Sequence, residues 1–257
     1  MPFPILMYHA LSVEQSREKY VLTTTQFRSH LKLIRDAGQK GVSVEQITTG
    51  RSAYDASVIL TFDDGHISNK EQALPILEEF GYSATFYITT GYIGSSPEWM
   101  TWKDLQALKD AGMDIGVHGH THRFMDELND ADLELELRQP LFCIEEHLGF
   151  RPRHLAYPGG RYDQAANARA FQCGYVTLAT SKPGLVSFDP QRKLPLLLDR
   201  FVVHQGTDTK TVSKLIERDW AMVAKNRMAY QLKWAIKKAL GNRLYHHLWK
   251  LKMEGYR

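Results

Sequence analysis

Two short motifs carry the residue types that bind metal ions and activate water. They are Thr-Phe-Asp-Asp-Gly at 61–65 and His-Gly-His-Thr-His at 118–122. Each follows an apolar run, 58–62 or 113–117, that predicts a strand. Because sites in α/β folds form at the carboxyl ends of strands, we expect both motifs at such ends. One carboxylate and two imidazoles would leave an open position on a zinc-like ion, and a second carboxylate could act as a base.

The spacing within each motif allows this chemistry but does not require it. Asp63 and Asp64 would point to opposite faces of a continuing strand, but a turn at the following glycine lets one face an ion while the other lies beside it. Asp-Asp-Gly is also common in solvated turns. His118 and His122 can converge on one ion if the chain coils after its strand. In an extended chain, His120 would share a face with both.

A third segment, 155–163, contains Tyr-Pro-Gly-Gly after another expected strand. This sequence is typical of a tight turn. The turn can be purely structural. Alternatively, it can aim a backbone N–H at a developing oxyanion and place the ring of Tyr157 beside a sugar.

The chain between these motifs repeats one unit of short apolar strand, polar loop, helix and glycine cap. Thr101 and Asp104 resemble a capping box at one helix start. Longer helices are expected from about 126 to 148 and from 164 to 172. Helices alternating with short strands predict a parallel sheet with crossover helices. With about seven such units, a closed or partly open barrel is favoured over a flat sheet.

The composition fits one large α/β domain. The chain has 257 residues, of which 43% are hydrophobic and 24% charged, and its net charge of +3 gives no indication of nucleic-acid binding. Cys143 and Cys173 are expected to be buried, reduced thiols. The N-terminal segment lacks the basic region and long apolar run of a signal peptide, and no stretch suits a membrane span. We therefore expect a cytoplasmic protein.

The charge is concentrated at the C-terminal end. Residues 219–257 hold nine Lys or Arg against two acidic residues, an excess of seven positive charges. We expect a catalytic domain over 1–210 and a basic helical tail over 211–257. Leu244, Leu248 and Leu251 share a helical face, which suits a helix on an anionic membrane. Packing of the tail on the barrel or on another subunit is the alternative.

Taken together, the motifs resemble the polysaccharide deacetylase family, whose catalytic unit is the NodB homology domain. Residues 61–65 resemble its first motif, 118–122 its His-x-x-x-His motif, and 155–160 occupy the place of the third. The opening segment 4–9 resembles a bacterial branch of the family. The similarity covers about residues 4–205.

This resemblance implies a distorted (β/α) barrel that hydrolyses an N-acetyl group, usually on N-acetylglucosamine units. It implies one divalent ion; we expect zinc, with cobalt, nickel or manganese as alternatives. Carried over by position, Asp64, His118 and His122 are the metal ligands and Asp63 is the general base. The oxyanion would be held by the metal and by the backbone N–H of Gly159.

The sequence departs from the family pattern at two positions. The third motif of the family carries an arginine that steadies the base, but Ala156 stands here. Arg200 could supply that charge, or it could be an ordinary surface residue. The late Leu-x-x-His of the family, which supplies the acid, has no clear match. His9 and His204 end the first and last expected strands, and we favour His9 because Met-Tyr-His resembles the bacterial branch.

The expected function is N-deacetylation of an amino sugar in bacterial envelope or exopolysaccharide biosynthesis. For a cytoplasmic enzyme, a lipid-linked or nucleotide-linked precursor fits better than finished polymer. Two enzyme alternatives share the scaffold: a deformylase for a lipid-linked amino sugar and an allantoinase-like C–N hydrolase. A carbohydrate-binding protein without activity is the non-enzyme alternative, which Ala156 leaves open.

Overall fold

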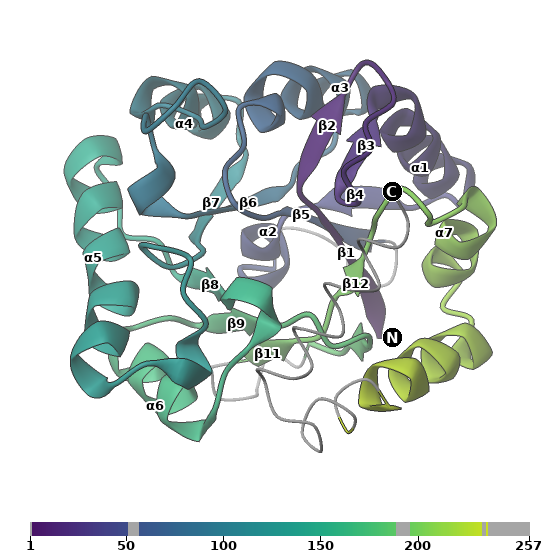
Figure 1. Cartoon of the computed structure of the whole chain (residues 1–257). Coiled ribbons are helices and arrows are strands. Elements are labelled where there is room, and N and C mark those ends of the chain that lie inside the picture. The colour runs from purple at the N-terminus through teal and green to yellow at the C-terminus, as the bar shows by residue number, and fades with distance from the viewer. Residues whose placement is uncertain (1, 51–56, 189–195, 233–234, 236–257) are drawn as a thin grey trace.

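Parallel strands form the wall of a nearly closed barrel in the computed structural model, which describes residues 2–50, 57–188, 196–232 and 235 (Figure 1). Neighbouring strands pair in the order β1 (Phe3–Tyr8), β5 (Ser57–Phe62), β6 (Thr85–Ile88), β7 (Asp114–Val117), β8 (His154–Ala156), β9 (Thr177–Ala179) and β11 (Leu196–Leu198). Each of these pairs is parallel. The predicted distorted (β/α) barrel is confirmed.

Short strands extend this wall. Two pair in parallel, β4 (Lys40–Val42) with β5 and β12 (Phe201–Val202) with β1, whereas β10 (Leu185–Val186) pairs with β1 in the antiparallel sense. A separate parallel pair is formed by β2 (Ala10–Ser12) and β3 (Val21–Thr23). Because β12 lies beside β1, the two histidines that follow these strands, His9 and His204, come from the same rim.

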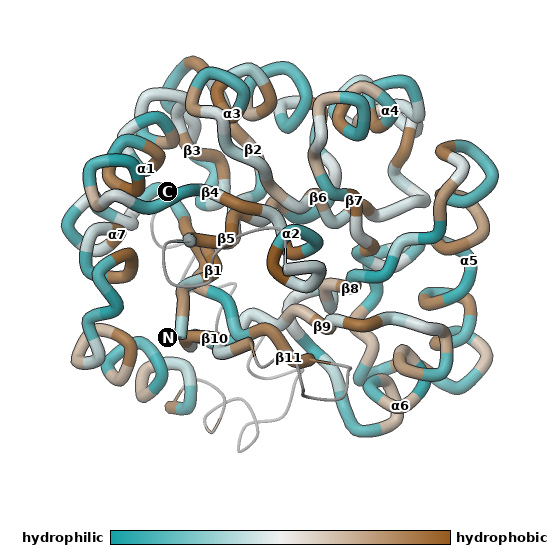
Figure 2. Tube along the Cα trace, turned by 180° about the vertical axis from the view of Figure 1, so that it is seen from behind, coloured by the Kyte–Doolittle hydropathy of each residue, from teal (hydrophilic) through white to brown (hydrophobic). Residues whose placement is uncertain are grey.

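Helices cover the outside of the barrel. They are α1 (Thr24–Asp36), α3 (Leu74–Phe80), α4 (Trp102–Asp110), α5 (Asp130–Leu148), α6 (Gln164–Gln172) and α7 (Thr209–Ile216). A further short helix, α2 (Val44–Thr48), lies across the mouth of the barrel that faces the viewer in Figure 2. Since α2 covers that mouth, a functional site is expected at the opposite mouth, where the strands have their carboxyl ends.

The strands are apolar on both faces, because one face packs against the helices and the other packs inside the barrel. All six residues of β1 and all six of β5 are buried. One hydrophobic cluster lies between strands and helices, and a second lies inside the barrel around Ile5, Ile59 and Tyr87. Burial on both faces is characteristic of parallel sheets covered by helices.

Local capping explains where the helices begin. The Thr101–Asp104 capping box is present at the start of α4, as predicted. However, α5 begins at Asp130 rather than near 126, because the side chain of Asn129 accepts a hydrogen bond from the backbone N–H of Asp132. The residues before it form a short 3₁₀ turn, η4 (Met125–Glu127).

The expected boundary at residue 210 falls within α7, whose buried side chains Val212, Leu215 and Ile216 pack in the main core. Residues 220–232 are helical. The predicted leucine stripe at 244–251 lies outside the described residues. Within the part of the chain that the structure describes, no helix is both long and apolar enough to cross a membrane.

Both cysteines are free thiols. Cys173 is buried, as expected, whereas Cys143 on α5 is only partly buried.

Candidate metal and acid–base site

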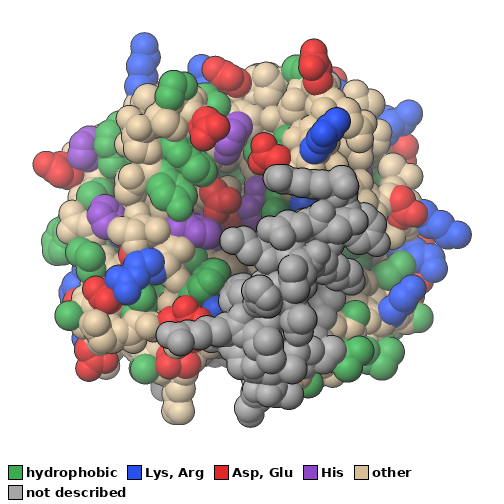
Figure 3. Space-filling model, viewed as in Figure 1, with side chains coloured by type: hydrophobic (Ala, Val, Ile, Leu, Met, Phe, Trp, Pro, Cys, Tyr) green, Lys and Arg blue, Asp and Glu red, His purple; other side chains and the backbone are tan. Residues whose placement is uncertain are grey.

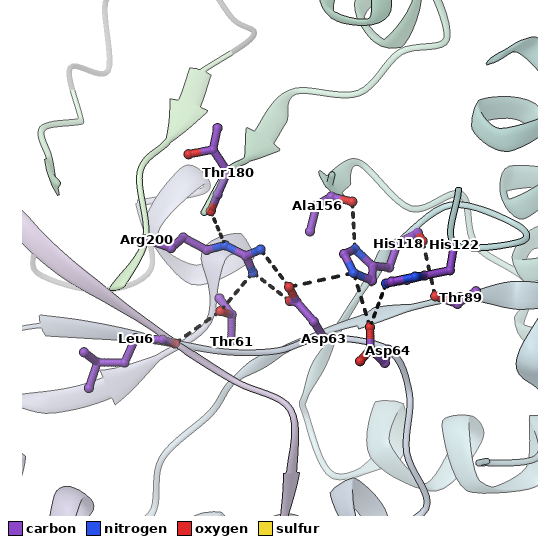
Figure 4. Close-up of polar contacts among 10 residues, drawn as sticks. All are labelled: Leu6, Thr61, Asp63, Asp64, Thr89, His118, His122, Ala156, Thr180 and Arg200. Carbon is purple, nitrogen blue, oxygen red and sulfur yellow. Dashed lines mark hydrogen bonds and ion pairs between the residues drawn. The ribbon is translucent and has the colours of Figure 1, made fainter. Parts of the chain in front are cut away.

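Three ligand atoms converge at the carboxyl ends of β5 and β7 (Figure 4). The Nε2 atoms of His118 and His122 lie 3.3 and 3.2 Å from Oδ1 of Asp64. All three ligand atoms lie within 4.8 Å of one another. That carboxylate oxygen is buried without another hydrogen-bond partner. The arrangement fits one divalent ion, because a carboxylate and two imidazoles are a common open ligand set.

The backbone coils sharply at these ligands. Asp64 and His122 have φ values of 78° and 63°, which non-glycine residues rarely adopt. Gly119, between the two histidines, has a φ of 77°. These conformations turn the chain after each strand, so that residues four apart face the same point. Such strain is often found at functional sites.

Hydrogen bonding fixes which nitrogen of His118 is available. Its Nδ1–H donates to the carbonyl of Ala156 at 2.9 Å, and its backbone N–H donates to Ile88. Nε2 is therefore the nitrogen left to face the carboxylates and to bind an ion, as in histidines that bind metals. The carbonyl of Ala156 is thus part of the site, although the family's arginine is missing there.

His120 turns away from this centre. Its Nδ1 lies 2.9 Å from the hydroxyl of Thr90. Its backbone N–H and that of Thr121 donate to the carboxylate of Glu136, at 2.7 and 3.0 Å. Glu136 is only 1% exposed and comes from α5. This buried carboxylate holds the histidine loop in place. Sequence patterns missed it, because a glutamate in an amphipathic helix gives no signal of its own.

Asp63 is held by Arg200 in a paired, bidentate arrangement. The two guanidinium Nη atoms lie 2.7 Å from the two carboxylate oxygens. Arg200 also donates to the carbonyl of Thr180 at 2.9 Å and to the hydroxyl of Thr61 at 3.2 Å. Its side chain is 0% exposed, so it is not a surface residue. The charge that position 156 lacks therefore reaches Asp63 from the segment between β11 and β12.

These contacts keep both aspartates ionised. Burial alone would raise the pKa of Asp63, but the charge and hydrogen bonds of Arg200, with His118, outweigh it and hold the pKa below its usual range. Burial would likewise raise the pKa of Asp64, but hydrogen bonds from His118 and His122 hold it well below the usual range. A carboxylate ionised at neutral pH is what a general base requires.

The two candidate acids differ in their surroundings. His9 is partly buried, packs against Tyr20 with tilted rings whose centroids are 4.9 Å apart, and lies near enough to feel the charges of both aspartates. Burial lowers its pKa, and the aspartates partly oppose this. His204 instead turns its Nδ1 back to accept the backbone N–H of Gly206 at 3.0 Å. The geometry favours His9.

The Tyr-Pro-Gly-Gly turn lies against the histidine loop, residues 118–122. A Cβ atom on Gly119 would come within 3.5 Å of Pro158. Gly159 is exposed and has a φ of 60°. The ring of Tyr157, in contrast, is wholly buried, and its hydroxyl donates to Asn167 at 2.7 Å. The prediction that this ring lines a sugar site is therefore wrong, because the residue belongs to the core.

Histidine and acidic side chains gather around a hollow on the face drawn in Figure 3. Two aromatic rings border the ligands. Tyr92 stacks on His122 with centroids 6.0 Å apart, and Trp99 lies 4.5 Å from Tyr92. Both rings are partly buried. Flat ring surfaces thus lie next to the candidate ligands.

Comparison with known proteins agrees with this geometry. The YxkH protein of Bacillus subtilis (strain 168), whose name describes it as a polysaccharide deacetylase, is 26% identical over 190 residues. The match covers 72% of this chain and 67% of YxkH. Two solved structures share the fold. The deacetylase PplD of Streptococcus pyogenes, solved with acetate, has a TM-score of 0.74 and 23% identity over 84% of this chain and 98% of its own. IcaB from Ammonifex degensii has a TM-score of 0.72 and 22% identity, and the match covers 84% of this chain and 97% of IcaB. A family model for polysaccharide deacetylase matches residues 50–178, half of the chain. The chain therefore belongs to the polysaccharide deacetylase family.

Proposed function

We propose that this protein is a metal-dependent N-deacetylase that removes an acetyl or similar acyl group from an amino sugar of bacterial envelope or exopolysaccharide biosynthesis. One observation carries the proposal. Asp63 is held ionised by Arg200 directly beside the three converging ligands Asp64, His118 and His122. A base next to an open metal site is the arrangement that amide hydrolysis by water requires.

Different groups of the protein would assist separate steps of the hydrolysis. A divalent ion at Asp64, His118 and His122 would supply Lewis-acid chemistry, acidifying water and polarising the acyl carbonyl. Asp63 accepts the proton of the attacking water. The backbone N–H of Gly159 donates to the oxyanion that forms on the acyl carbon. His9 gives a proton to the departing amine, which is a poor leaving group unless protonated.

The test is release of acyl product from defined substrates. The protein, stripped of metal and reloaded with zinc, cobalt, nickel or manganese, is incubated with N-acetyl and N-formyl chitooligosaccharides. We expect acetate release that depends on metal. Formate release alone would favour a deformylase. Sugar binding without product, in a protein with bound metal, would favour the non-catalytic alternative.

We also propose that the C-terminal region holds the enzyme at the cytoplasmic face of an anionic membrane, where a lipid-linked sugar would be presented. The helical residues 220–232 support this. Trp220, Met228 and Leu232 are each more than 60% exposed, at 66%, 63% and 63%. On a helical projection they fall on one side, flanked by Lys225 and Arg227. Basic residues beside an apolar stripe are typical of interfacial helices.

Vesicle sedimentation tests this contact in the full chain. Serine at Trp220, Met228 and Leu232 should reduce binding to anionic vesicles, and binding should also fall with added salt. Serine at Phe142 and Phe171, exposed rings on α5 and α6, is the matched control. Equal binding by both variants and the wild type would remove the membrane role.

A further inference from the structure

A widened helical turn directly follows the first motif. Residues Asn69–Ala73 form a π-helical turn, η2, in which the backbone N–H of Leu74 donates to the carbonyl of Asn69, five residues back. It leads into α3, which has Pro75 in its first turn. Proline has no N–H and its ring clashes with the carbonyl four residues earlier. A wider turn relieves that clash, and π turns of this kind occur frequently at functional sites.

Residues at the start of this turn hydrogen-bond to the bend in the chain that carries His9. The side-chain amide of Asn69 donates to the carbonyl of His9 at 2.6 Å. Two residues further on, the backbone N–H of Leu11 donates to the hydroxyl of Ser68 at 2.9 Å. That hydroxyl is itself 2.8 Å from Nδ1 of His66. The bend between β1 and β2 is therefore fixed from one side by consecutive residues of a single turn.

Asn69 makes this contact at a cost to stability. It is 0% exposed, and its Oδ1 is buried without a hydrogen-bond partner among the described residues. An unsatisfied buried acceptor destabilises the fold. An apolar side chain would avoid this cost, so the benefit of the amide lies in its bond to the backbone of His9.

We propose that Asn69 is a positioning residue, which sets the direction of the His9 ring toward the leaving amine by holding its carbonyl. The inference rests on the proposed function, in which His9 protonates that amine. Tyr20 also packs against this ring, with centroids 4.9 Å apart. Among the described residues, Asn69 hydrogen-bonds to His9, His66 and Leu74. Its loss should therefore impair only the step that needs the acid.

Two substrates separate this role from general damage. An N-acetyl chitooligosaccharide needs a proton on its leaving amine, whereas 4-nitrophenyl acetate releases a phenolate that needs none. Asn69→Ala should lower kcat on the amide by about 10- to 100-fold, within or below the usual range for a positioned acid. Its KM, its metal content and its turnover of the ester should stay within about twofold of wild type. Asn69→Leu, which leaves no cavity, should behave in the same way.

The controls decide between positioning and folding. Ser43→Ala removes a buried hydroxyl that caps α2 at the opposite mouth of the barrel, and it should change neither activity. Asn69→Ala combined with His9→Ala should be no slower than His9→Ala alone, because residues acting through one group are not additive. Equal losses on amide and ester, or an unchanged amide rate, would overturn the proposal.

A measurement without substrate separates this proposal from the proposed function. The imidazole resonances of His9, recorded by NMR on labelled full-length protein, should shift in Asn69→Ala and stay in place in Ser43→Ala. Wild type that cleaves neither substrate would end the deacetylase assignment. Unshifted His9 resonances in Asn69→Ala would end the positioning role, whatever the activity.

Discussion

Replacing Arg200 by methionine should remove both stability and catalysis, for one physical reason. The substitution leaves the carboxylate of Asp63 buried without the two 2.7 Å bonds that now satisfy it. Breaking a buried ion pair by removing one partner typically costs about 3–5 kcal/mol. The free energy of unfolding should fall by about that amount. Adding Asp63→Asn should restore part of it, because no buried charge remains.

The effect on the base follows from the same pair. Without Arg200, burial is less opposed and the pKa of Asp63 rises. The acid limb of the rate profile should therefore move to higher pH. A protonated Asp63 cannot accept a proton from water.

The assay is the pH dependence of kcat/KM together with unfolding by denaturant. Arg169→Met is the matched control, because Arg169 pairs with Glu134 at 2.8 Å while remaining 35% exposed. Exposed pairs contribute about 0–1 kcal/mol, so this variant should keep its rate profile. An Arg200→Met enzyme with an unmoved acid limb would show that another group keeps the base ionised.

Three other variants test separate parts of the site and core. Asp63→Asn should retain its metal while turnover falls roughly 10²–10⁴-fold, and loss of metal would instead make Asp63 a ligand. Glu136→Leu offers no acceptor to the two backbone N–H groups of the histidine loop, so metal affinity should fall roughly 10- to 100-fold in a chelator competition. Burial lowers the pKa of His30 to about 4 from 6.5, so the unfolded state binds more protons and stability is lost as pH falls between those values. From pH 8 to pH 5 this should cost wild type about 2 kcal/mol more than His30→Gln, as measured by denaturant unfolding.

The convergence of Asp64, His118 and His122 was predictable from the sequence, because residue type and order along the chain indicate it. Asp64, His118 and His122 follow apolar strands, and parallel strands bring their carboxyl ends to one rim. The coil that separates His120 from its neighbours was not predictable, because it depends on Gly119 and on the carboxylate of Glu136 in a distant helix.

Contacts between distant segments were the harder part. Arg200 lies far along the chain from Asp63, and only the closure of the barrel brings them together. Tyr157 was misassigned because a tyrosine beside a turn carries the same sequence signal whether its ring faces the core or a substrate. The start of α5 was placed too early because the apolar and acidic pattern continues across Asn129, which in fact caps the helix.

Anomalous scattering from crystals of the zinc-loaded protein would locate the ion directly. We expect one ion, about 2.0–2.2 Å from Oδ1 of Asp64 and from Nε2 of His118 and His122. Asp63 should remain paired with Arg200 beside it. An ion bound by His120 in place of His122, or no ion at this position, would show that the assigned metal site is wrong.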